Sequence, residues 1–213
     1  MFNGQNYSKI SSELAIFGTK ILAATKTKGK EEVLAAFEGG IRLFGENYVL
    51  EAYEKYLPLL NKLHSAGGEL HLIGHLQSNK AKKAVELFDC IETIDSIKIA
   101  SKVNLAAQEQ NKIMKVMIEV NFEEKKAGVS LGEAIILAQK IHELSNLKLI
   151  GLMCIPKIGE EESAFSKMQK LKQTIGVSEL SMGMSGDYML AAKHGATIVR
   201  LGTILFGERE EKN

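Results

Sequence analysis

Residues 114–154 read MKVMIEVNFEEKKAGVSLGEAIILAQKIHELSNLKLIGLMC, and this stretch decides the fold. It opens with one aliphatic run, Met114–Val120, and closes with a second, Leu147–Cys154. Between them, Leu131–Leu144 has helical spacing with one core-facing side, formed by Ala134, Ile135, Leu137, Ala138 and Ile141. Short aliphatic runs are typical of buried parallel strands, and a helix between two of them implies a right-handed crossover. The stretch therefore predicts a βαβ unit.

The same alternation recurs along the chain on both sides of this unit. It gives eight strand candidates: Lys20–Thr25, Ile41–Phe44, Leu70–Ile73, Cys90–Ile94, Met114–Val120, Leu147–Cys154, Glu179–Met182 and Thr197–Leu201. The other helical stretches are residues 31–37, 48–62, 96–108, 163–175 and 187–194. Eight βα units in about 200 residues predict a closed, TIM-type (β/α)8 barrel at the small end of its size range. An open doubly wound sheet is the alternative, although it would normally need fewer strands.

The composition is that of a single globular domain, residues 1–213. Pro58 and Pro156 are the only prolines, and no Ser/Gly-rich stretch marks a linker. Lys plus Arg is 27 and Asp plus Glu is 26, and this net charge of +1 argues against a protein that coats nucleic acid. No apolar run approaches the roughly 18 residues that span a bilayer, and Met1–Ser12 lacks the order of a signal peptide. We therefore expect a cytoplasmic protein that binds neither nucleic acid nor membranes.

Cysteine and metal chemistry are not indicated. Cys90 and Cys154 lie far apart in apolar stretches, which argues against a disulfide framework and a cysteine-based zinc site. The five histidines lack the paired spacing of metal ligands. The chain has no nucleophile-elbow serine and no Gly-rich P-loop with its lysine.

In a (β/α)8 barrel, functional residues gather where the strands end and the following loops begin. The last two strand candidates are followed by glycines and hydroxyl groups, in Ser181–Asp187 (SMGMSGD) and in Gly202-Thr203. Backbone N–H groups and hydroxyls at these places would form an anion site. Ordinary tight turns with a helix cap are the alternative. The position on two adjacent strands favours phosphate, because barrels often bind phosphate there.

Lys26 ends the first apolar strand, where its side chain would point into the barrel mouth. Desolvation at that place would lower the lysine pKa and free a nucleophilic amine for a Schiff base. A solvated lysine, continued by Lys28 and Lys30 in a basic loop, is the alternative, and spacing alone favours it. His75 and Asn47 could orient a ligand, although such lone residues more often bond within their own loop.

Two strings are highly specific in this order and spacing, Ile73-Gly-His-Leu-Gln-Ser-Asn-Lys80 and Leu180-Ser-Met-Gly-Met-Ser185. They are accompanied by Ala24-Thr-Lys-Thr-Lys28, Phe44-Gly-Glu-Asn-Tyr48, Lys126-Ala-Gly128, Gly151-Leu-Met-Cys-Ile-Pro156 and Val199-Arg-Leu-Gly-Thr203 with Phe206-Gly207. Together these segments resemble the pyridoxal 5′-phosphate (PLP) homeostasis protein family, also called the proline-synthetase-co-transcribed family. The resemblance extends from Lys20 to Arg209.

The resemblance implies a PLP-binding barrel like the N-terminal domain of alanine racemases. It matches Lys26 to the lysine that holds PLP as a covalent internal aldimine, and Arg200 to the arginine that faces the pyridine nitrogen. The other matching positions are Ser185, Gly202 and Thr203 for the phosphate, and Asn47, His75 and Met182 around the cofactor.

Besides an amino-terminal helix that looks short, the sequence departs from the family pattern at two places. The residue before the lysine is usually serine and here is Thr25, which keeps the hydroxyl. An aromatic residue commonly precedes the Ile-Gly-His string, and here Leu70 and Leu72 frame His71. Neither change touches the lysine or the phosphate positions.

Two functions fit such a barrel: a PLP-dependent amino-acid racemase and a non-catalytic handler of PLP. In the racemases whose barrel this chain resembles, a β-domain follows the barrel and supplies the second catalytic base. Only 10 residues follow Thr203 here, so we expect no such domain. Arg200 adds a permanent cation that keeps the pyridine nitrogen unprotonated and weakens PLP as an electron sink.

We therefore expect a protein that is not an enzyme and that takes part in intracellular PLP homeostasis. It would store PLP reversibly, protect the reactive aldehyde, and leave one face open from which acceptor apo-enzymes or amines collect it. A closed barrel without a second domain favours a monomer.

Overall fold

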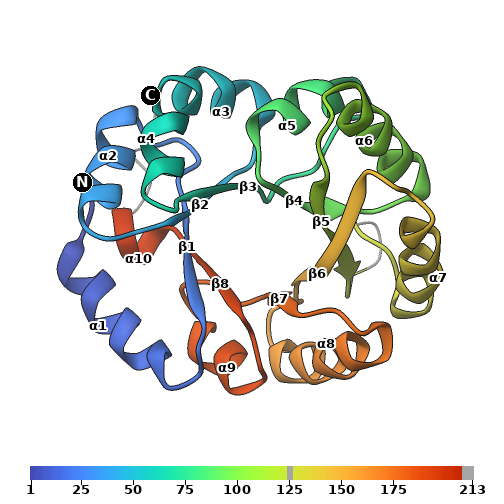
Figure 1. Ribbon diagram of the computed structural model, residues 1–213. Helices are drawn as coiled ribbons and strands as arrows, with labels where there is room; N and C mark the ends of the chain where they lie inside the picture. Colours follow the sequence, from blue (N-terminus) through green and yellow to red (C-terminus); the bar gives the residue numbers. More distant parts are fainter. Residues whose placement is uncertain (124–126, 208–213) are drawn as a thin grey trace.

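The computed structural model describes residues 1–123 and 127–207 (Figure 1). Eight parallel strands close into a barrel in chain order, because the last strand pairs with the first, Lys20 lying opposite Ile198. The strands are β1 Lys20–Ala24, β2 Leu43–Glu46, β3 Glu69–Leu72, β4 Cys90–Ile94, β5 Met114–Asn121, β6 Leu147–Ile155, β7 Glu179–Ser181 and β8 Ile198–Leu201. This arrangement confirms the predicted (β/α)8 barrel and rules out the open sheet.

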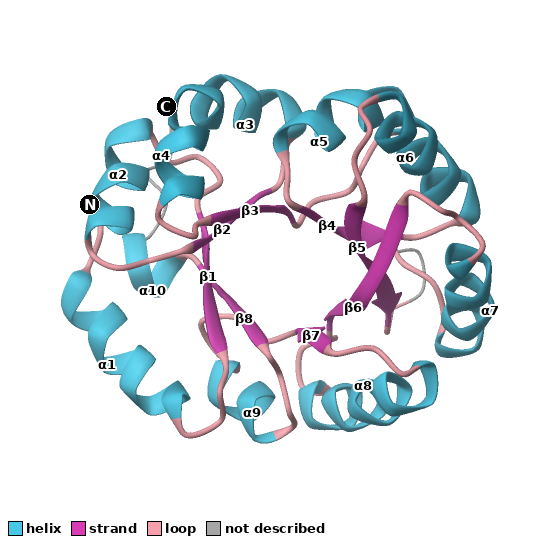
Figure 2. Ribbon diagram, viewed as in Figure 1, coloured by secondary structure: helices cyan, strands magenta, loops and turns pink. Residues whose placement is uncertain are grey.

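Helices form a ring outside the strands (Figure 2). In the described chain they are α1 Gly4–Ala15, α2 Lys30–Glu38, α3 Val49–Tyr56, α4 Leu60–Ser65, α5 Ala81–Leu87, α6 Ile97–Glu109, α7 Leu131–His142, α8 Glu161–Ile175, α9 Tyr188–Lys193 and α10 Thr203–Phe206. Two short 3-10 turns, Leu57–Leu59 and Ser78–Lys80, complete the set. Lys126 and Arg209, at which the sequence resembles its family, lie outside the described residues.

The predicted βαβ unit is present as β5, α7 and β6. Strands β5 and β6 pair from Met114–Leu147 to Asn121–Ile155, with one irregularity after Val116. Helix α7 begins with a capping box, in which the Ser130 hydroxyl accepts from the Glu133 N–H and the Glu133 carboxylate accepts from the Ser130 N–H. This start signal explains why the helix begins at the expected residue.

One predicted helix is wrong as a continuous element. Residues 48–62 were expected to form a single helix, but α3 ends at Tyr56 and α4 begins at Leu60. Pro58 lies between them in the 3-10 turn, and proline cannot donate the backbone hydrogen bond that an uninterrupted helix requires. The break matters because it ends α3 directly after Lys55 and Tyr56, which pack behind the barrel mouth.

The core has two parts. Most buried aliphatic side chains lie between the helices and the outer side of the barrel. A smaller cluster fills the barrel interior and comprises Leu22, Leu43, Cys90, Met117 and Ile198. The interior is not wholly apolar, because Glu92 and Arg200 are also buried there. In the part of the chain that the structure describes, no helix combines the length and the apolar character that a membrane crossing requires.

Candidate functional site

A cavity of about 320 Å³ opens at the carboxyl ends of the strands, where the sequence predicted the functional residues. The described residues that line it are Ala24, Lys26, Thr27, Lys28, Asn47, Ile73, Ile155, Met184, Ser185, Gly186, Arg200, Gly202, Thr203 and Gly207. Six of the eight predicted site residues are among them. Since Arg200 lies in β8 and the others lie just after β1, β2, β7 or β8, the closed barrel is what brings them together.

Lys26 lies in the turn that directly follows β1 and is half-buried. The preceding Thr25 is fully buried, and its N–H donates to the Gly45 carbonyl of β2 at 3.0 Å. The following Thr27 has a φ of 67°, in the left-handed region that a β-branched residue rarely adopts. The lysine is thus presented to the cavity from a tightly held and locally strained turn.

Arg200 points from β8 into the barrel and is only 5% exposed. Its Nη1 donates to the Ser181 hydroxyl at 2.9 Å, and its Nη2 donates to the Cys154 carbonyl at 2.8 Å. Burial alone would raise the pKa of Glu92, but the hydrogen bond from His71 and the charges of His71 and Arg200 hold that pKa below its usual value. Arg200 therefore helps to keep a buried carboxylate ionised while its side chain reaches the cavity.

The loops after β7 and β8 offer hydrogen-bond donors that the described chain does not use. The backbone N–H groups of Ser185, Gly186 and Thr203 donate to no other group in residues 1–123 and 127–207. Gly183 lets the first loop turn, because its φ is 93° and a Cβ there would overlap the side chain of Ala191. Unused donors on two adjacent loops of one cavity form a site for an anion.

Asn47 follows β2 and lines the same cavity. Its Oδ1 atom is buried and accepts no hydrogen bond, which is unusual for a buried amide oxygen. The backbone of Asn47 lies directly on Gly74, since a Cβ on Gly74 would overlap the Asn47 carbonyl. This contact fixes the backbone from which the Asn47 side chain reaches the cavity.

Two predicted site residues do not line the cavity. The His75 side chain is 55% exposed, and its Nδ1 lies 3.3 Å from Asp95 Oδ2. Met182 is fully buried in the core, and its N–H donates to the Ile198 carbonyl at 3.0 Å. Sequence reasoning missed Met184 and Ile155, which do line the cavity, although Met184 stands inside the Ser181–Asp187 segment that signalled the loop.

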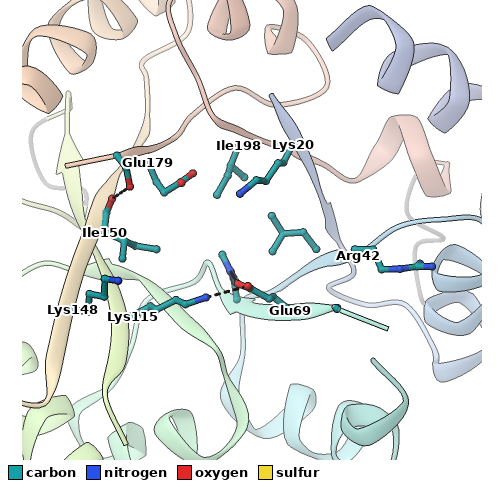
Figure 3. Close-up of a pocket in the computed structure, with 12 residues that line it drawn as sticks. Lys20, Arg42, Glu69, Lys115, Lys148, Ile150, Glu179 and Ile198 are labelled. Atoms are coloured by element: carbon teal, nitrogen blue, oxygen red, sulfur yellow. Dashed lines mark hydrogen bonds and ion pairs between the residues drawn. The ribbon is translucent and has the colours of Figure 1, made fainter. Parts of the chain in front are cut away.

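A second cavity, of about 350 Å³, lies at the opposite, amino-terminal end of the strands. Figure 3 shows its charged lining, in which Lys115 donates to Glu69 at 3.1 Å. Glu69 Oε2 also lies 3.3 Å from His71 Nε2, so this carboxylate is shared between two cations. Glu69, His71 and Lys115 pair with one another at this end, and the lining residues come mainly from strand beginnings, which in a barrel of this type seldom carry the functional residues. We therefore assign the chemistry to the carboxyl-end cavity.

His71 connects this second cavity to the barrel interior. The side chain is 3% exposed, and its Nδ1 lies 2.6 Å from Oε1 of the buried Glu92. Burial would lower the pKa of His71, but the hydrogen bonds to Glu69 and Glu92 and their negative charges outweigh burial and raise it to about 9. His71 is therefore a cation at neutral pH.

Comparison with known proteins agrees with the fold and shows the family. The family model described as alanine racemase, N-terminal domain, matches residues 4–210. The pyridoxal phosphate homeostasis protein of Vibrio alginolyticus is 41% identical over 202 residues, which are 90% of this chain and 87% of that protein. The structure of PipY from Synechococcus elongatus with PLP bound is 32% identical, with a TM-score of 0.86 over 96% of this chain and 99% of that one.

Alanine racemase of Clostridium difficile shares the fold, with a TM-score of 0.75 and 15% identity over 99% of this chain and 59% of that one. Fold and site thus define a barrel of the class formed by the N-terminal domain of alanine racemase. Within this class, the chain belongs to the pyridoxal phosphate homeostasis protein family. The resemblance found in the sequence is confirmed.

Proposed function

We propose that this protein binds PLP through a Schiff base on Lys26 and acts in intracellular PLP homeostasis without turning over a substrate. One observation carries the proposal: Lys26, Arg200 and the unused N–H donors of Ser185 and Thr203 all face one cavity. The family assignment and the PLP-bound structure of PipY support it.

The residues that line the cavity fit the chemistry of PLP. Lys26, Lys28 and Arg200 are cations, and no carboxylate lies among the described lining residues, which suits a dianionic phosphate. The donors of Ser185, Gly186 and Thr203 would hold the phosphate, together with the hydroxyls of Ser185 and Thr203. Asn47, which lines the same cavity, would offer its amide to a polar group on the ring.

PLP supplies an aldehyde whose carbon reacts with a primary amine. The Lys26 amine would form a C=N bond to that carbon and release one water molecule, so the bond is reversible by hydrolysis or by exchange with another amine. Arg200 would face the pyridine nitrogen as a permanent cation and keep it unprotonated. These two contacts, with the phosphate donors, would orient the ring.

The lining of the cavity favours a carrier over a racemase. Racemisation needs two groups that exchange protons on opposite faces of the substrate. The described lining residues include no aspartate, glutamate, histidine, cysteine or tyrosine, so the second acid–base group that a racemase needs is not among the side chains usual for that task. A pyridine ring that stays unprotonated beside Arg200 would also withdraw less charge from a developing carbanion than a protonated ring does.

The proposal places the protein in the cytoplasm, as a monomer that stores PLP and protects its aldehyde. Acceptor apo-enzymes or free amines would collect PLP through the open mouth of the barrel. Because the bond to Lys26 is exchangeable, delivery would need no chemistry beyond attack by another amine.

The absorbance spectrum of the protein with PLP, before and after borohydride, tests this function together with an activity assay. We expect a Schiff-base band that borohydride removes, and no turnover of alanine or other amino acids. Turnover near the usual enzyme median of about 10 per second would instead establish a racemase or related enzyme. A protein that shows neither Schiff base nor turnover would contradict both functions.

A further inference from the structure

A buried ion cluster lies behind the Lys26 turn and takes no part in lining the cavity. Its members are Glu46 at the end of β2 and Glu51 and Lys55 on α3. Lys55 Nζ lies 2.8 Å from Glu46 Oε1 and 3.2 Å from Glu51 Oε1. Glu46 is fully buried and Lys55 is 7% exposed, so neither charge is solvated.

The cluster holds both neighbours of Lys26. Lys55 Nζ donates to the Thr25 carbonyl at 2.9 Å, and the Thr25 hydroxyl donates to Glu46 Oε1 at 2.6 Å. On the other side, the Thr27 N–H donates to Glu51 Oε1 at 3.0 Å. Glu51 and Lys55 therefore contact the residue after the lysine and the residue before it.

The hydrogen bond between the Thr27 N–H and Glu51 stabilises an unfavourable backbone conformation. A φ of 67° at a β-branched residue is unfavourable and persists only where the surroundings impose it. The hydrogen bond from the Thr27 N–H to Glu51 supplies such a constraint, since it fixes the peptide between Lys26 and Thr27. Without that bond, the turn could relax and the lysine side chain would start from another direction.

Stability alone does not account for this cluster. Burying charges is unfavourable, and well-packed apolar residues of similar volume often replace a buried ion pair without loss of stability. Burial raises the pKa of Glu46 although the charge of Lys55 opposes it, and Glu46 Oε2 has no hydrogen-bond partner. Positions so unfavourable for charge are more readily explained by a geometric role.

We infer that Glu46, Glu51 and Lys55 are positioning residues, which fix the Lys26 turn so that its amine meets the aldehyde of bound PLP. The inference rests on the proposed Schiff base at Lys26. None of the three touches the cavity, so they would change how well the amine is aimed and leave the binding of the phosphate and ring unaltered.

Glu51 offers the sharpest test, because it is partly exposed and its loss leaves the buried pair intact. Glu51→Ala removes the acceptor for the Thr27 N–H, whereas Glu51→Gln keeps an oxygen there. Glu54→Ala, on the exposed side of the same helix, is the matched control. Each variant is titrated with PLP, by Schiff-base absorbance, and with pyridoxine 5′-phosphate, an analogue without an aldehyde.

We expect Glu51→Ala to lower the equilibrium constant for Schiff-base formation about tenfold, the size of one lost hydrogen bond to a charged group. Glu51→Gln should recover most of it, Glu54→Ala should match the wild type, and all should bind pyridoxine 5′-phosphate alike. In the protein without PLP, hydrogen exchange at the Thr27 amide should accelerate in Glu51→Ala only.

An unchanged Schiff-base constant in Glu51→Ala, despite faster exchange at Thr27, would overturn the positioning role. Equal losses in Glu51→Ala and Glu51→Gln would also overturn it, since the acceptor would then not matter. A wild-type protein that binds PLP without labelling Lys26 under borohydride would contradict the proposed function itself. The pyridoxine 5′-phosphate and exchange measurements distinguish that failure from the other two.

Discussion

Arg200 donates from Nη1 to the hydroxyl of Ser181 at 2.9 Å, across the pair of strands β8 and β7. Its second terminal nitrogen donates to the Cys154 carbonyl of β6 at 2.8 Å, so three neighbouring strands hold one guanidinium. A guanidinium stays charged at every pH that the protein tolerates. The barrel thus carries a permanent cation from its interior to the floor of the carboxyl-end cavity.

Removing this cation should destabilise the fold as well as the site. In Arg200→Leu, the buried Glu92 loses a charge that helps to keep it ionised, and two hydrogen-bond acceptors lose their donor. We expect the free energy of unfolding, measured with urea, to fall by about 3 kcal/mol. Lys28→Ala removes a loop cation at the same cavity that makes only long contacts with the described residues, 3.9 Å to Glu32 and 3.5 Å to the Phe206 carbonyl, and should change the free energy of unfolding by less than about 1 kcal/mol. Equal values for the two variants would mean that Arg200 is not structurally coupled to Glu92.

Lys26 should be the residue that carries PLP. Borohydride reduction followed by peptide mapping should place the pyridoxyl group on Lys26, because Lys28 lies beyond the turn and Lys55 is engaged by Glu46 and Glu51. Lys26→Ala should abolish the Schiff-base absorbance and leave the fold intact, since a rim side chain contributes little to the core. Lys28→Ala should keep the absorbance. Labelling mainly at Lys28 or Lys80 in the native protein would identify a different lysine.

The barrel could be predicted because its strands are short aliphatic runs whose spacing is visible in one sequence. Cys90–Ile94 has the bounds that the sequence indicated, and Lys20–Ala24 differs by one residue. Helix α5 was missed, because seven residues show too little periodicity to stand out. The break at Pro58 was missed because the apolar spacing continues on both sides of it.

The site could be predicted where it depends only on strand ends. Parallel strands bring their carboxyl ends to one rim, so Lys26 and Thr203 line one cavity although they lie 177 positions apart in the sequence (203 minus 26). The charged interior could not be predicted in this way. Lysine on an amphipathic helix is normally solvated, and nothing in the sequence indicates that Lys55 turns inward to Glu46. The pairing of His71 with Glu92 likewise exists only once β3 and β4 are adjacent.

The phosphate of PLP should be bound by the loops after β7 and β8. Ser185→Ala removes a hydroxyl from the cavity and should weaken PLP retention by about 1.5–3 kcal/mol, the value of one hydrogen bond to a charged group. The affinity for pyridoxal, which has no phosphate, should stay the same in wild type and variant. Equilibrium dialysis with PLP and pyridoxal in competition measures the affinity of each protein for both compounds. If wild-type protein bound pyridoxal as tightly as PLP, the anion site would have no role.

His71 should make stability depend on pH above neutrality. Its pKa is about 9 in the folded protein, against 6.5 for an unperturbed histidine, because Glu69 and Glu92 stabilise the proton against the opposing effect of burial. Because the folded protein binds this proton more tightly than the unfolded chain, His71 contributes its full stabilisation below about pH 6.5. That contribution is lost as pH rises through 9. Glu69 has the opposite sign: its pKa is lowered to about 2 by its hydrogen bond to His71, so its contribution is lost as pH falls below 4.5 toward 2.

The shifts of Glu69 and His71 together predict a plateau of stability between about pH 4.5 and 6.5, with a decline on the alkaline side. Urea unfolding at pH 6 and pH 9 should differ by up to about 3 kcal/mol in the wild type. His71→Gln should be less stable at pH 6 and should lose most of that difference, because its amide cannot bind the proton. His64→Gln is the matched control, since His64 faces Asp89 at 3.1 Å on the surface with its side chain 45% exposed. If His71→Gln lost as much stability between pH 6 and pH 9 as the wild type, the loss would come from other groups, and His71 would be uncharged in the folded protein.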